Sequence, residues 1–131
     1  MRGSVASYRP HMPPAHEKSA AVEAAVASLT NGEPPQREIL RSAVRSLLSD
    51  LSAKAPGRSV EVRIPPYGAI QCVEGPRHTR GTPANVVEMD PVTFIELEAG
   101  LRSWSDAVRD GRIQASGNRA DISHLFPIRE T

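Results

Sequence analysis

The chain has 131 residues, of which 39% are apolar and 24% charged, and its formal net charge is +1. This length fits one domain that can bury its own core. A near-neutral charge does not favour a nucleic-acid binder, because such proteins gain affinity from a surplus of Lys and Arg. Aromatic residues make up only 4%, so the core must be built from Val, Ile, Leu and Ala.

Residues 1–15 read as a disordered leader, because Pro10, Pro13 and Pro14 interrupt any regular element there. The sequence contains no 18-residue apolar stretch that could span a membrane. The leader also lacks the apolar centre of a signal peptide. We therefore expect a cytoplasmic protein, with the folded domain over residues 16–131.

The first part of that domain, residues 16–55, predicts a helix hairpin. Val22, Val26 and Leu29 recur at helical spacing until Asn31-Gly32, and a second helix is expected from Pro35 to Lys54. The second helix carries an apolar stripe wide enough to lie on a sheet: Leu40, Val44, Leu47, Leu48 and Leu51.

The second part, residues 58–131, begins with strands. Residues 59–64 alternate strictly between apolar and polar, which is typical of a half-buried strand. Residues 67–73 are apolar on both sides, which indicates a second strand in a central position of the sheet. Pro65-Pro66 joins the two as antiparallel neighbours, and residues 85–89 predict a short third strand.

Two capped helices and a further strand should follow. Asp90-Pro91 opens one helix, because Asp can accept from first-turn N–H groups and Pro suits the first helical position. Residues 103–106 resemble a capping box for a second helix. Residues 112–116 predict a strand with Ile113 and Ala115 inward, and Asp121 should cap a last helical turn that ends near Phe126.

The order of these elements from Asp90 to Phe126 resembles that of the sterol carrier protein family. A Phe-x-x-Leu-x-x-Gly step is followed by a short helix, a Gly-basic-apolar-x-apolar-x-Gly strand and a closing helix. The positions that carry the likeness are Phe94, Leu97, Gly100, Ala107, Gly111, Arg112, Ile113, Ala115, Gly117 and Asn118. The chain looks most like a short bacterial branch, which carries the segment from Glu74 to Pro83.

The resemblance implies an α+β fold, with a five-stranded, mainly antiparallel sheet covered on one face by helices. It also implies an apolar tunnel for lipids between helices and sheet, with no metal, no cofactor and no catalytic residues. The residues expected to line such a tunnel are apolar and lie in the C-terminal part of the chain: Phe94, Leu97, Leu101, Trp104, Val108, Ile113, Leu125 and Phe126. Trp104 can either plug the core or sit at the mouth of the cavity.

Arg77, His78, Thr79 and Arg80 form the most unusual polar segment, between two glycines. Its guanidinium groups and backbone N–H groups suit a phosphate or carboxylate. They can also pair with Glu74, Glu88 or Glu61 and stiffen the loop, which is the simpler interpretation, or contact another protein. Cys72, the only cysteine, lies in an apolar run and reads as a buried structural thiol.

Two functions remain open from the sequence. One is a non-catalytic binding protein that holds a lipid or another apolar or amphipathic small molecule between helices and sheet. The alternative is a protein-interaction module with the same fold and a filled core, which could form a homodimer. An enzyme is disfavoured, because the four His are dispersed and no nucleophile–base pair or phosphate-binding motif is present.

Overall fold

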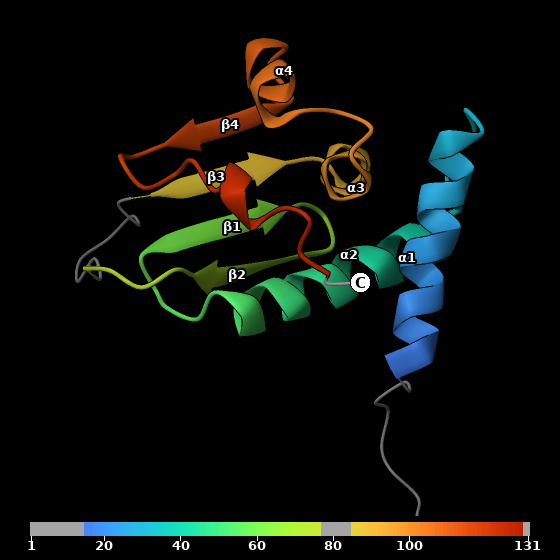
Figure 1. Ribbon diagram of the computed structural model, residues 1–131, viewed down its shortest axis with the longest axis horizontal. Coiled ribbons are helices and arrows are strands. Elements are labelled where there is room, and N and C mark those ends of the chain that lie inside the picture. Colours follow the sequence, from blue (N-terminus) through green and yellow to red (C-terminus); the bar gives the residue numbers. More distant parts are fainter. Residues whose placement is uncertain (1–14, 77–84, 130–131) are drawn as a thin grey trace, which may run out of the picture.

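The computed structural model describes residues 15–76 and 85–129. The expected leader lies outside these residues except for Ala15, which begins the first helix, and the Arg77–Arg80 segment lies outside them altogether. Figure 1 shows the arrangement of the elements. They are α1 (Ala15–Thr30), α2 (Arg37–Lys54), β1 (Val60–Ile64), β2 (Gly68–Cys72), β3 (Val86–Met89), α3 (Pro91–Ala99), α4 (Trp104–Arg109), β4 (Ile113–Ser116) and the 3-10 turn η2 (Ser123–Leu125).

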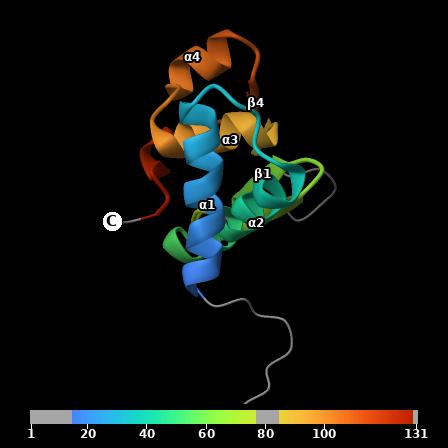
Figure 2. The same ribbon diagram turned by 90° about the vertical axis from the view of Figure 1, so that its right-hand side faces the viewer.

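Two helices, α1 and α2, pack against each other where the helix hairpin is predicted, but α2 begins at Arg37 with Gln36 as its N-cap, so Pro35 lies before the helix and not in its first turn. The first helix ends where Gly32 adopts a left-handed conformation and its N–H donates to the Leu29 carbonyl. The second helix buries the expected stripe, with Val44, Leu47 and Leu51 fully buried. Figures 1 and 2 show α1 crossing α2 at one end of the sheet. No helix among the described residues is long and apolar enough to cross a membrane.

The sheet has four strands in the order β2-β1-β3-β4, where the resemblance implied five. The β1–β2 and β3–β4 pairs are antiparallel, while β1 and β3 are parallel, with Val62 opposite Val87. The sheet is therefore mixed. The predicted central position of β2 is wrong, because β2 is an edge strand. Its apolar residues on both sides reflect one side packed against α2 and one exposed Ala69, not two buried faces.

The two faces of the sheet differ in chemistry. Val60, Val62 and Ile64 of β1 are buried on the inner face, and β2, β3 and β4 add further buried residues there. Glu61 and Arg63 alternate with them on the outer face, where the Arg63 guanidinium donates to the Glu61 carboxylate at 3.0 Å. The inner face therefore buries the apolar residues of the sheet, which agrees with the predicted cover of helices on one face only.

The predicted caps of α3 and α4 are present, but the predicted Asp121 cap is not: Ile122 holds the N-cap position of η2, and the Asp121 carboxylate accepts from the Ser123 N–H at 3.0 Å just before that turn. The Asp90 carboxylate accepts from the Thr93 N–H at 3.1 Å, and the Ser103 hydroxyl accepts from the Asp106 N–H at 3.1 Å. In β4, Ile113 is buried as expected, but Ala115 is exposed. β4 is the other edge strand, and its last three residues are exposed.

The last segment closes the core. In Figure 1 it runs in front of the strands toward α2, and Ile122, Leu125 and Ile128 are buried. The Lys54 ammonium donates to the carbonyls of Leu125 at 3.0 Å and Pro127 at 2.8 Å. The end of α2 therefore holds the C-terminal segment in place.

Candidate functional site

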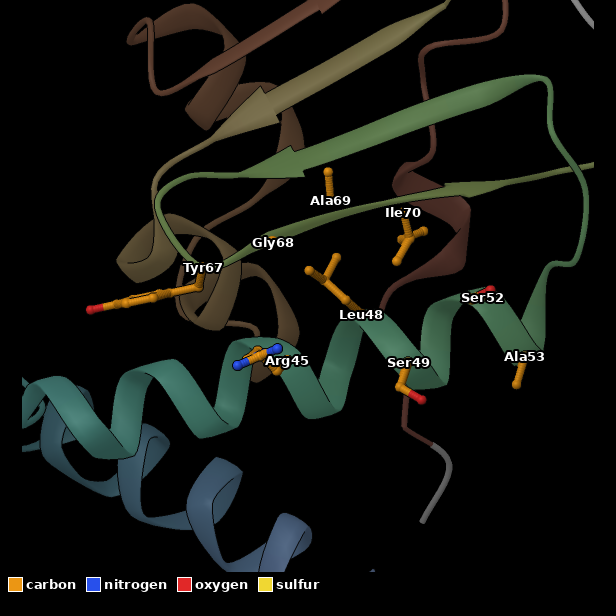
Figure 3. A pocket seen from close by; sticks show the side chains of 9 residues that line it. All are labelled: Arg45, Leu48, Ser49, Ser52, Ala53, Tyr67, Gly68, Ala69 and Ile70. Carbon is orange, nitrogen blue, oxygen red and sulfur yellow. The ribbon is translucent and has the colours of Figure 1, made fainter. Parts of the chain in front are cut away.

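A surface groove runs between α2 and the free edge of β2 (Figure 3). Its volume is about 520 Å³, which lies in the range of small-molecule sites. It is open along its length and not enclosed in the core. The helix and the strand contribute similar numbers of lining residues: Arg45, Leu48, Ser49, Ser52, Ala53, Tyr67, Gly68, Ala69 and Ile70.

The groove forms at a free edge of the sheet, because within the described part of the chain no strand pairs with the outer edge of β2. Gly68 and Ala69 are exposed and small. A Cβ at Gly68 would lie 3.2 Å from Leu48 Cδ1, closer than ordinary van der Waals contact. Gly68 therefore leaves room for Leu48 to approach the strand while the groove stays open on either side.

The lining is mixed, because apolar residues such as Leu48 and Ile70 alternate with residues that carry polar groups: Arg45, Ser49, Ser52 and Tyr67. Figure 3 shows Leu48 and Ile70 pointing toward each other across the groove, with Tyr67 and Arg45 near one end. Arg45 is exposed, and within the described residues no carboxylate oxygen lies within 4.0 Å of its guanidinium. An apolar body with an acidic group at one end matches this arrangement, because Arg prefers carboxylate and phosphate partners.

Of the eight residues expected to line a tunnel, four lie in the packed interior, two are partly buried and two are exposed. Phe94, Leu97, Ile113 and Leu125 are buried core residues. Of these eight residues, Phe126 lines a pocket beside the C-terminal segment, and none lines the groove between α2 and β2. Their role in ligand binding stays a prediction.

Trp104, Phe94 and Phe126 form an aromatic cluster. The Phe94 and Phe126 rings meet edge to face with centroids 6.0 Å apart, and Trp104 lies 6.3 Å from Phe126. The geometry agrees with a plug at the rim of the core for Trp104. By contrast, Leu101 is 47% exposed and Val108 is 43% exposed. These two residues therefore lie on the surface and do not join the other six predicted lining residues.

Cys72 is fully buried, as expected. Desolvation raises the pKa of its thiol to about 11, so the thiol stays protonated at neutral pH. No group of three or more His, Cys, Asp and Glu within residues 15–76 and 85–129 is arranged to hold a metal ion.

A family model described as bacterial SCP ortholog matches residues 36–128. The chain belongs to this family. The match begins just before α2 and ends in the C-terminal segment, so it includes the groove and the whole sheet. The family points in general to a carrier-type role in lipid binding. A search of curated proteins found no match to this chain.

Sequence analysis missed every residue of the groove. Arg45 lies off the apolar stripe of α2 and gave no signal beyond a charged helix face. Ser49 and Ser52 are ordinary surface residues at helical spacing. The groove forms only when this side of α2 lies beside an edge strand, and the sequence pattern predicts a central position for β2.

Proposed function

We propose that this protein binds an amphipathic small molecule with an acidic head, such as a single acyl chain, in the groove between α2 and β2. The acyl chain contacts Leu48, Ile70 and Tyr67, and the head pairs with Arg45. The observation that carries the proposal is a groove in which Leu48 and Ile70 face each other (Figure 3), next to an exposed guanidinium without a carboxylate partner in the described residues.

Two further points support a surface groove over an internal tunnel. The core between sheet and helices is filled by side chains at near-zero exposure, including Phe94, Leu47 and Met89. The family match covers the groove and suggests lipid binding in general. A non-catalytic carrier is consistent with both, because such a role needs only a reversible apolar surface and an orienting charge.

A second candidate is a protein-interaction module. The filled core and the exposed edge of β2 favour it, because an unpaired strand edge can accept a strand from another chain. In that case the groove would hold part of a protein partner, and small amphiphiles would not stabilise the fold.

Thermal unfolding with and without ligand distinguishes the two. We expect dodecanoate at about a hundred times its Kd to stabilise the fold by roughly 2.7 kcal/mol, a rise in Tm of roughly 8 °C for a domain of this size. The neutral alcohol dodecanol should bind more weakly. Ser52→Phe places a ring in the groove and should abolish both effects.

Arg45→Gln tests the head-group contact. It should weaken dodecanoate binding roughly fivefold, because an exposed ion pair contributes up to about 1 kcal/mol, and should leave dodecanol binding unchanged. Arg41→Gln is the matched control, since Arg41 lies one turn earlier on α2 and does not line the groove. Equal Tm values with and without both ligands, in wild type and in Ser52→Phe, would reject the proposal.

A further inference from the structure

A second pocket, of about 600 Å³, lies beside the C-terminal segment, separate from the groove. Four parts of the fold build it: α1, the end of α2, the end of α3 and residues 124–129. Its charged or titratable lining residues are Lys54, Glu98, His124 and Arg129, and its remaining walls are Val26, Ala99, Phe126 and Pro127.

Glu98 supplies the only carboxylate among the lining residues of this pocket, and both of its oxygens already accept hydrogen bonds. The Glu98 side chain has 0% exposure. One of its oxygens accepts from the Ile128 N–H at 2.6 Å, and the other accepts from the N–H and the Nε of Arg129 at 3.0 and 3.2 Å. Arg129 also pairs with Glu23 at 3.2 Å. Arg129 together with its two carboxylates therefore carries a net charge of −1.

Lys54, unlike Arg129, pairs with no carboxylate among the described residues. Its ammonium donates to two backbone carbonyls and, among the described residues, has no carboxylate within 4.0 Å. Carbonyl oxygens satisfy two of its three donors but carry no formal charge. One N–H of Lys54 therefore remains free for a ligand, and its charge has no carboxylate in direct contact, although Glu98 and Glu23 balance the charges of Lys54 and Arg129 overall. The exposed His124 imidazole is a further lining donor.

We propose that this pocket binds a small organic oxyanion, a phosphate monoester or carboxylate with a short apolar substituent. Lys54 supplies the charge, and Arg129 and His124 supply additional N–H donors. The apolar substituent contacts Val26 and Phe126, which is why an organic anion should bind better than a bare inorganic one. This site does not depend on a ligand in the groove between α2 and β2.

Butyl phosphate and inorganic phosphate, added separately to the 15N-labelled full chain, test the proposal. Saturable shifts are expected for the backbone amides of Ala99 and Phe126, with butyl phosphate binding at least several-fold more tightly. Lys54→Gln should weaken butyl phosphate binding roughly fivefold or more, because it removes the unpaired charge while an amide can still donate to the two carbonyls. Arg58→Gln, a change of one charge outside the pocket, should have no effect.

The unbound spectrum of Lys54→Gln shows whether the C-terminal segment stays in place. With that spectrum retained, unchanged butyl phosphate binding overturns the role of Lys54. Absence of saturable shifts overturns the site, and equal affinity for the two phosphates overturns the organic ligand. Ser52→Phe, which blocks only the groove, should bind butyl phosphate as wild type does. This variant therefore distinguishes a failure of the groove proposal from a failure of the proposal for the pocket beside the C-terminal segment.

Discussion

The buried carboxylate of Glu98 should be among the costliest single side chains to remove. It is the acceptor for three N–H groups of the C-terminal segment, and its side chain has 0% exposure. Glu98→Ala would leave the Ile128 N–H without an acceptor and would leave Arg129 with only its exposed contact to Glu23. The segment would then lose these hydrogen bonds to α3 and would keep the contact between Phe126 and Phe94.

The expected loss follows from these contacts. Removing one partner of a buried charge pair costs about 3–5 kcal/mol. Arg129 is 23% exposed and keeps Glu23, so the low end, about 3 kcal/mol, applies. For a domain of this size that corresponds to a fall in Tm of roughly 10 °C. Glu98→Gln keeps the shape but turns an amide N–H₂ toward N–H donors, so it should lose about 2 kcal/mol.

Urea unfolding monitored by Trp104 fluorescence measures the loss, because Trp104 is the only tryptophan and contacts Phe126 in the same segment. A midpoint lowered by roughly 2 M is expected for Glu98→Ala. A midpoint within about 0.5 M of wild type, at unchanged slope, would refute the reasoning. Full stability in Glu98→Gln together with a large loss in Glu98→Ala would instead show that volume matters and hydrogen bonding does not.

Two other predictions concern the backbone and the thiol. Gly57→Ala should cost about 3 kcal/mol or more in thermal unfolding, because strain and overpacking add: Gly57 has φ +150° and an added Cβ would lie 2.1 Å from the Val73 carbonyl oxygen. Gly32→Ala, with open space at φ +75°, is the control and should cost about 1 kcal/mol; similar losses in both would contradict the steric argument. Native Cys72 should react with a thiol reagent at pH 8 only as fast as the protein opens, and fast labelling before unfolding would contradict its burial. Because its pKa is raised to about 11, the native state retains a proton that the unfolded state has lost, so the free energy of unfolding should fall as pH rises from about 9 toward 11.

Elements governed by local rules could be predicted from the sequence. Asp90 and Ser103 cap their helices as expected, because a side-chain oxygen next to first-turn N–H groups needs no information from the rest of the chain. The stripe on α2 and the alternation in β1 likewise gave the buried face correctly. The family likeness was carried by the same kind of local spacing, and the match to residues 36–128 confirmed it.

What depends on neighbours far along the chain could not be predicted. The parallel pairing of Val62 with Val87 joins two strands that are separated in sequence by β2 and a loop. The residue pattern of neither strand indicates whether the two strands run parallel or antiparallel. The edge position of β2 had the same cause, since period-two patterns do not distinguish an edge from a centre when residues such as Ala69 are small. The groove depends on the edge position of β2, so it could not be predicted either.

The late place of the C-terminal segment in the sequence has a consequence for folding during synthesis. Ile122, Leu125 and Ile128 complete a core whose other walls, α2 and β1, come much earlier in the chain. Until these residues leave the ribosome, the emerging chain carries exposed apolar surface on the sheet and an unpaired Glu98. The helix hairpin and the β1–β2 hairpin can form early from near neighbours, whereas the stable fold should appear only once residues 120–129 are available.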